Sequence, residues 1–327
     1  MKRVYFFIFA LFIVAALSVA SLAGYGWHLF KSPGPLATET TFLLKKGTGL
    51  RSLSKELLEK NIVNNDLAFV FGVKLEKMGR NLRAGEYLVP AGLSGYGLMN
   101  LFVSGKVIER RITIPEGLES REIRELVLQA DGLTGDITVA MPEGAYLPET
   151  YHYQLGDSRE ELVARMAEDM RILTMEVWTL RDPDSEIKTV EELIILASIV
   201  EKETALASER PHVAGVFLNR LRKGMKLQSD PTVVYGITEG KHELGRPLSK
   251  KDLASKNAYS TYHISGLPKG PIANPGEESL RAVLQPLQTK DLYFVADGTG
   301  GHAFSETLDG HNANVRKWRK LNRKKKK

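Results

Sequence analysis

A chain of 327 residues, of which 43% are hydrophobic and 26% charged, is long enough for two folded units and has the composition of a globular protein. Its formal net charge of +6 fits nucleic-acid binding, and it fits equally well an exported protein that works beside anionic lipid and wall polymers. Because cysteine is absent, disulfides, cysteine-ligated zinc, iron–sulfur clusters and thiol nucleophiles are excluded.

The N-terminus carries an export signal. Residues 4–27 form an uncharged, mostly apolar run that directly follows Lys2 and Arg3. The run exceeds the ~20 residues that a bilayer-spanning helix needs, and the basic start predicts a cytoplasmic tail at residues 1–3 and export of the chain after Lys31. Ser21-Leu22-Ala23 offers a cleavage site, so a removed signal peptide is the alternative to a retained anchor. We predict an anchor at 4–27 and a linker at 28–40.

Residues 41–140 contain two similar strand–turn–helix patterns. The first has a strand at 41–44, a turn at 45–49 and a helix at 50–60, whereas the second has a strand at 111–114, a turn at 115–117 and a helix at 120–129. Gly47 and Gly117 are the matching turn glycines. The module resembles LysM, a small glycan-binding α/β unit; ordinary α+β packing that positions the next domain is the alternative.

A second domain is predicted at residues 141–315. Helices are expected at 158–179, 190–204, 209–223 and 277–287, and a strand follows at 292–296. A loop-rich region at 228–275 separates the third helix from the fourth. The fold class is therefore α+β. The tail at 316–327 is strongly basic, which fits either a solvated helix end or attraction to acidic wall polymer or lipid.

The helix at 190–204 carries a carboxylate where its apolar stripe predicts a hydrophobe. The stripe ends at Val200, and Glu203 continues it, whereas Glu201 is expected to point away around the helix. Burial raises a carboxyl pKa and can make a glutamate a general acid near neutral pH, which glycosidic cleavage requires. The alternative is a glutamate that is solvated or paired with Lys202, Arg210 or Arg220.

Other chemistries find less support in the sequence. Standard glycosidases use a second carboxylate, and Glu143, Glu149 and Asp230 are loop candidates among which nothing local selects. No His-Glu-x-x-His, glycine-rich phosphate loop or Gly-x-Ser-x-Gly motif occurs, so neither a metal nor a cofactor is predicted. The loop region instead combines aromatic, amide and hydroxyl groups of the kind that sugar clefts use: Gln228, Tyr259, Thr261, Tyr262 and Asn274.

Ordered motifs from Glu143 to His311 resemble the YceG-like family of endolytic murein transglycosylases. They include Val200-Glu201-Lys202-Glu203-Thr204, Phe217-Leu218-Asn219-Arg220-Leu221, Gln228-Ser229-Asp230-Pro231-Thr232, Tyr259-Ser260-Thr261-Tyr262, Gly270-Pro271-Ile272-Ala273-Asn274-Pro275 and Gly301-His302-Ala303-Phe304. Two departures, Lys269 and Ser260, affect subsite contacts rather than the chemistry.

The resemblance implies a lysozyme-like catalytic helix on which Glu203, in a Glu-Thr pair, is the essential acid. The enzyme would cleave the β-1,4 bond between N-acetylmuramic acid and N-acetylglucosamine inside nascent strands, leave a 1,6-anhydromuramic end and need no second carboxylate. Substrate-binding or supporting roles are expected for residues of these motifs and of the loops and helices beside them, namely Glu201, Thr204, Glu149, Tyr151, Asn219, Gln228, Asp230, Tyr235, Tyr259, Thr261, Tyr262, Asn274, His302 and Phe304.

The resemblance also implies a single-pass inner-membrane protein with a cytoplasmic N-terminus and a periplasmic catalytic domain. Its partners would be peptidoglycan glycan strands and peptidoglycan synthases of the elongation or division machinery, and not nucleic acid. Two other functions are open: a muramidase that hydrolyses the same bond with water, and a non-catalytic peptidoglycan-binding scaffold.

Overall fold

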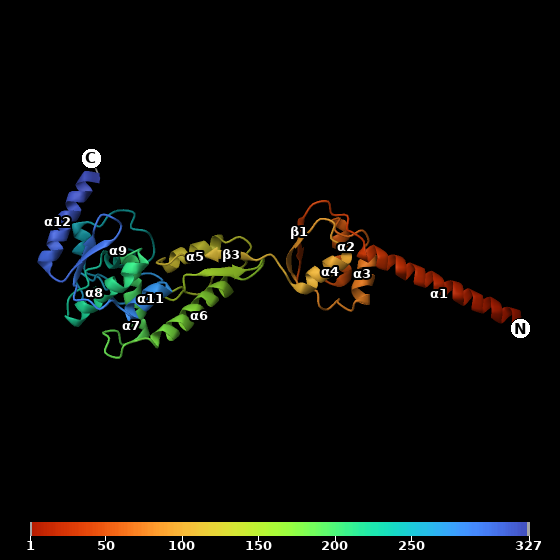
Figure 1. The fold of residues 1–327 in the computed structure, drawn as a ribbon, viewed down its shortest axis with the longest axis horizontal. Helices are drawn as coiled ribbons and strands as arrows, with labels where there is room; N and C mark the ends of the chain where they lie inside the picture. The colour runs from red at the N-terminus through yellow and green to blue at the C-terminus, as the bar shows by residue number, and fades with distance from the viewer. Residues whose placement is uncertain (1, 326–327) are drawn as a thin grey trace. The chain divides into compact units, whose positions relative to one another are not determined.

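The computed structural model describes residues 2–325 and has a mixed α and β fold (Figure 1). Its internal contacts divide the chain into two compact units. The first unit runs to Arg110 and includes Tyr153–Leu155; the second comprises Arg111–His152 and the chain from Gly156 onward. The α+β class predicted from the sequence is therefore confirmed.

Helix α1 (Lys2–Lys31) is long and apolar enough to cross a membrane, and its large side chains up to Tyr25 are exposed. The helix continues beyond the predicted anchor, because Phe30 is buried in the first unit against Phe69 and Tyr96. Gly72 is required at this contact, since a Cβ atom there would lie 2.2 Å from the Phe30 ring. The expected linker at 28–40 therefore begins only after Lys31.

The rest of the first unit surrounds one small sheet. Its elements are β1 (Thr40–Leu44), α2 (Leu50–Glu59), α3 (Asp66–Leu75), β2 (Gly85–Val89) and α4 (Gly95–Ser104). Strands β1 and β2 pair antiparallel with Phe42 opposite Tyr87, and both rings are buried in the core of this unit. The strand at β1 and the helix at α2 agree with the sequence pattern, whereas α3, β2 and α4 were not predicted.

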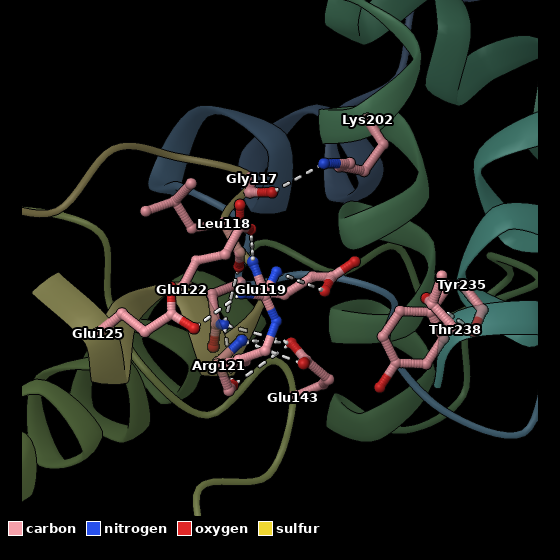
Figure 2. A network of polar contacts seen from close by, with 12 residues as sticks. Gly117, Leu118, Glu119, Arg121, Glu122, Glu125, Glu143, Lys202, Tyr235 and Thr238 are labelled. Atoms are coloured by element: carbon pink, nitrogen blue, oxygen red, sulfur yellow. Dashed lines mark hydrogen bonds and ion pairs between the residues drawn. The ribbon is translucent and has the colours of Figure 1, made fainter. Parts of the chain in front are cut away.

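The second strand–turn–helix pattern forms β3 (Arg110–Thr113) and α5 (Ser120–Gln129), but α5 packs within the second unit rather than with β1 and α2. Long-range contacts explain this. In the turn before α5, the Gly117 amide donates to Asn274 O (3.0 Å), and the Gly117 carbonyl accepts from Lys202 Nζ (3.1 Å; Figure 2). Strand β3 pairs with β4 (Thr150–Tyr153). The contacts thus divide the chain near Arg110, not at residue 141.

Helix α7 (Val190–Glu203) is the central helix of the second unit. A capping box between Thr189 and Glu192 starts it, and nearly every side chain from Leu193 to Val200 is buried. It packs against α6 (Arg159–Trp178), α8 (Arg210–Arg222), α9 (Asp230–Thr238) and α11 (Glu277–Leu284). A helix that is apolar on all sides belongs in a core, and α7 therefore places its final carboxylate inside the fold.

The second unit also contains short connecting elements and a terminal helix. These are η1 (Ala207–Glu209), α10 (Lys250–Leu253), β5 (Tyr293–Ala296), β6 (His302–Ser305) and α12 (Leu308–Lys325). Strands β5 and β6 form an antiparallel hairpin, and α12 packs against both strands. The basic tail predicted at 316–327 is, through Lys325, the end of α12.

Candidate active site

Glu203 is the last residue of α7 and lines a cavity of about 450 Å³. Beyond it Thr204 turns the chain into an extended conformation. The ionisable and polar side chains that line the cavity with Glu203 are Arg220, Gln228, Asp230, Tyr262 and His311. Tyr293 and Phe294 of β5 add aromatic surface. The cavity therefore joins α7, α8, α12, the start of α9 and the β5–β6 hairpin around one carboxyl group.

A hydroxyl network holds Glu203. Ser229 Oγ donates to Glu203 Oε1 at 2.5 Å. Ser229 is fixed in turn, because its amide donates to Thr261 Oγ1 (2.9 Å) and its carbonyl accepts from Thr232 Oγ1 (2.6 Å). Ser229, Thr232 and Thr261 are all buried. One oxygen of the Glu203 carboxyl is thus held by the protein, while no hydrogen bond from the described residues engages the other.

The surroundings of Glu203 favour its neutral form. Burial raises the pKa of the Glu203 carboxyl to about 7, and the nearby Asp230 carboxylate acts in the same direction. The Ser229 hydrogen bond opposes this, as does the positive charge of Arg220. The carbonyl end of a helix also disfavours an anion. A carboxyl group with a pKa near the working pH can both give and take a proton during a reaction.

Asp230 and Tyr262 form a second pair in the cavity. Tyr262 Oη donates to Asp230 Oδ1 at 2.7 Å, and burial, followed by this hydrogen bond, raises the pKa of the Tyr262 phenol. Gln228 precedes them with a left-handed backbone (φ 53°), which turns the chain between the end of α8 and the start of α9. The predicted residues Gln228, Asp230 and Tyr262 therefore meet at Glu203.

Glu201 is buried rather than directed toward solvent, so the expectation that it points away from the core is wrong. Its side chain is 4% exposed, pairs with Arg210 Nη2 (2.8 Å) and accepts from the Gly276 amide (3.0 Å). Arg210 also pairs with Glu116 (2.6 Å). The sequence pattern misplaced Glu201 because α7 is covered on all sides. These bonds also mean that neither Arg210 nor Lys202 forms an ion pair with Glu203.

Several predicted residues lie outside the cavity wall and support the fold around it. Asn274 is fully buried, donates to Leu118 O (3.0 Å) and accepts from the Tyr146 amide (3.0 Å). Tyr235 packs edge-on against Tyr259, with ring centroids 4.8 Å apart. Thr261 acts on Glu203 only through Ser229. These residues brace the loops that carry Gln228, Asp230 and Tyr262.

The remaining predicted residues divide between the hairpin and more distant positions. Thr204 Oγ1 and His302 Nδ1 both bond Glu209 (3.2 and 2.7 Å), and Phe304 stacks on His212 with centroids 3.5 Å apart. Asn219 donates to Thr289 O, outside the cavity. Tyr151 is buried and donates to Leu147 O, and Glu149 is exposed.

Several residues of the cavity wall and its support are not assigned to the site from the sequence, among them Ser229, Arg220 and His311. Ser229 and Arg220 lie inside recognised motifs, so their positions beside assigned residues were the available signal. His311 lies in α12, outside the motifs quoted above. Among the residues that the structure describes, no group of three or more histidine or acidic side chains could hold a metal ion.

A match to a family of known proteins covers most of the chain. The family model described as YceG-like matches residues 42–317. The chain belongs to the YceG-like family. The match includes the first unit from Phe42 onward and every residue that lines the Glu203 cavity.

Curated YceG-like relatives are named endolytic murein transglycosylases. The relative from Bacillus subtilis is 29% identical over 84% of this chain and 83% of its own length. The relative from Streptococcus pneumoniae R6 is 28% identical over 95% of this chain, which spans 64% of that longer protein. The crystal structure of a YceG-like protein from Listeria monocytogenes superposes with a TM-score of 0.53 at 28% identity, covering 85% of this chain and 99% of the other.

The Ser229 hydrogen bond predicts a shift in the pH dependence of the reaction. If Glu203 acts as the acid, kcat/KM falls above pH 7 as the carboxyl deprotonates, because its pKa is about 7. The Ser229 bond favours the carboxylate, so Ser229→Ala raises the Glu203 pKa and moves this fall to higher pH. A pH–rate profile measures the shift.

The matched control for this experiment is Ser260→Ala, since Ser260 is buried in the same region and its hydroxyl has no hydrogen-bond partner among the described residues. Loss of the Ser260 hydroxyl can change subsite contacts and hence the size of kcat/KM, but the fall in kcat/KM should stay at the pH found for the native chain. Glu143 also has a pKa raised to about 7 by burial. A fall in rate that stays at the same pH in Ser229→Ala would assign the titration to a group such as Glu143 instead.

Proposed function

We propose that this chain is an endolytic murein transglycosylase that cleaves the β-1,4 bond between N-acetylmuramic acid and N-acetylglucosamine within peptidoglycan strands. The observation that carries the proposal is Glu203: a carboxyl group at the end of a buried helix, with a pKa raised to about 7, in a cavity lined by polar and aromatic side chains. Membership of a family whose curated relatives bear this name supports it.

The proposed mechanism needs only one carboxyl group. Neutral Glu203 donates its proton to the glycosidic oxygen as the bond from that oxygen to C1 of muramic acid breaks, which leaves an oxocarbenium-like centre. The resulting Glu203 carboxylate then accepts the proton of the C6 hydroxyl while O6 bonds to C1. The products are a strand with a new N-acetylglucosamine end and a strand with a 1,6-anhydromuramic end. Ser229 steadies the carboxyl group through both steps.

The rest of the chain would bring this site to its substrate. In the proposal α1 is a single-pass inner-membrane anchor with its N-terminus in the cytoplasm, and both units are periplasmic. The arrangement β1–α2–α3–β2 supports a LysM-like glycan-binding role for the first unit, and α7 would correspond to the catalytic helix of lysozyme-like enzymes. Termination of nascent strands would place the enzyme beside peptidoglycan synthases.

A specific observation favours one alternative. Asp230 is a second carboxylate in the same cavity, and an inverting or retaining hydrolase uses such a pair. A muramidase would therefore hydrolyse the same bond with water.

Mass spectrometry of digested murein separates the two reactions, because a transglycosylase product is lighter by one water than the hydrolytic product. We expect anhydromuramic ends from the native chain. Reducing muramic ends alone would establish the hydrolase, and the absence of cleavage together with retained binding to murein would establish a scaffold.

A further inference from the structure

The Glu203 cavity contains a buried positive charge that the proposed reaction does not use. Arg220 lies in the last turn of α8, is 7% exposed and lines the cavity. Among the described residues no carboxylate forms an ion pair with it, although Glu203 and Asp230 line the same cavity. A buried charge without a carboxylate partner is costly, which makes the Arg220 guanidinium a candidate to bind an oxygen of the substrate.

The protein uses only some of the hydrogen-bond donors of the Arg220 guanidinium. Arg220 Nε donates to Leu292 O (2.6 Å), and Nη1 donates to Leu227 O (2.7 Å) and Lys226 O (3.2 Å). Nη2 donates to no residue that the structure describes. Its two N–H groups therefore have no partner among the described residues, in a side chain that lines the cavity and is fixed by three other bonds.

Aromatic surface shapes the space around this donor. The Arg220 guanidinium lies over the Tyr293 ring, 5.3 Å from its centroid, and His311 stacks on the same ring at 5.4 Å. His311 adds no positive charge near neutral pH, because burial and Arg220 lower its pKa. The cavity thus offers one rigid cationic donor beside the Tyr293 ring, which suits a polar oxygen attached to a sugar.

We propose that Arg220 Nη2 binds the carboxyl-derived oxygen of the lactyl group on O3 of muramic acid and thereby determines which glycosidic bond faces Glu203. The inference rests on the proposed function. Successive sugars of the strand share the same N-acetyl, C6 hydroxyl and β-1,4 linkage and differ at O3. A donor that selects one of the two alternating bonds must therefore read the lactyl group.

The positive charge of Arg220 also fits a place beside the O3 substituent better than a place beside C1, the reacting carbon. A cation close to C1 would oppose the oxocarbenium-like centre, whereas the O3 substituent lies beyond C2 and keeps the guanidinium at a distance. A hydrogen bond to the N-acetyl oxygen would carry no information about register, since both sugars bear that group. A lactyl oxygen gains from the charge in its amide form and gains more as a free carboxylate.

The test is ligand binding to the full chain carrying Glu203→Gln, which prevents cleavage, in detergent by isothermal titration calorimetry. The probes are four tetrasaccharides: murein tetrasaccharide with a free lactyl carboxylate, the same with a lactyl amide, the same with the lactyl carboxyl reduced to an alcohol, and chitotetraose. We expect affinity to fall in that order, with the carboxylate at least tenfold tighter than the alcohol, and the alcohol within about threefold of chitotetraose.

Arg220→Lys in the same background keeps the charge and shortens the reach of the donor. We expect it to weaken binding of the carboxylate and amide ligands at least tenfold and that of chitotetraose less than twofold. Arg222→Lys is the matched control, because Arg222 lies on the same helix with an exposed side chain and faces Glu186 instead of the cavity. It should leave the whole series unchanged.

Equal loss for all four ligands, or no preference for the lactyl oxygen in the Glu203→Gln chain, would overturn the proposal. If Arg220→Lys does not fold, the affinities of the four ligands for the chain carrying Glu203→Gln alone decide. The ligands that lack the lactyl oxygen remove the proposed contact just as a change of Arg220 would. A negative result for Arg220 would not count against the proposed function. If the native chain forms anhydromuramic ends, it remains a transglycosylase, and it selects its bond by other contacts.

Discussion

Glu203→Gln is expected to lower murein cleavage by about 10²–10⁴-fold, the usual contribution of a general acid. Glutamine fits the same space and can keep a hydrogen bond to Ser229, but it has no proton to give to the glycosidic oxygen. Release of soluble fragments from purified murein, measured as initial rates, gives the loss. Glu191→Gln is the matched control, since Glu191 lies exposed in the first turn of the same helix, and it should retain cleavage within twofold.

The same variant is expected to be more stable than the native chain at alkaline pH. The Glu203 pKa rises on folding from an ordinary 4.5 to about 7, so the folded state binds more protons than the unfolded state between these values. Stability is then fully present below pH 4.5 and falls as pH rises through 7. Glutamine removes this loss.

Thermal unfolding followed by circular dichroism should therefore give Glu203→Gln a higher melting temperature than the native chain at pH 8 and an equal one below pH 4.5. A folded Glu203→Gln chain that still cleaves murein, beside a folded Glu201→Gln chain that does not, would move the acid role to Glu201.

The sequence located the buried carboxyl group of Glu203 because its signals there are local. Thr189 and Glu192 start α7, the apolar stripe fixes its length, and Glu203 interrupts the stripe at the end. The bounds of α5 and α6 followed from the same kind of pattern, and the structure places them within one residue of the prediction. Local periodicity and capping therefore determined the elements that position Glu203.

Helix α9 is not predicted, because the strand propensity of several of its residues hides the helical pattern. Thr232, Val233 and Val234 favour a strand when considered alone, although Pro231 is suited to the first turn of a helix. Tertiary contacts decide the outcome: Thr232 bonds Ser229 and Thr261 and packs at full burial. The position of Ser229 depends on these contacts, so the motif that contains it does not by itself show that its hydroxyl bonds Glu203.

The division of the chain and the role of Arg220 depend on pairs that lie far apart in sequence. Gly117 bonds Asn274, which keeps α5 with the second unit. Arg220 bonds Leu292 across 72 residues, which fixes its side chain in the cavity wall. A single sequence carries no periodic signal for either pair. Its pattern therefore predicts a domain boundary at 141 and offers Arg220 only as one possible ion-pair partner of Glu203.

Arg210→Met is expected to destabilise the second unit by about 3–5 kcal/mol near pH 8, the usual cost of leaving one member of a buried ion pair unpaired. The side chains of Arg210 and Glu201 are 8% and 4% exposed, so water cannot replace the lost partner. Burial already raises the Glu201 pKa, and loss of the guanidinium raises it further. Glu201 can therefore escape the penalty by protonation, and the destabilisation should shrink toward pH 5.

Urea unfolding in detergent measures this change, and Arg222→Met is its matched control. Arg222 pairs with Glu186 through a side chain that is 60% exposed, so its loss should cost about 0.5 kcal/mol or less. The double variant Glu201→Met/Arg210→Met removes both charges and should recover most of the stability, because no uncompensated ion then remains in the core. A double variant as unstable as Arg210→Met alone would instead mean that the bond from Arg210 to Glu116, and not the one to Glu201, holds the end of α7 that carries Glu203.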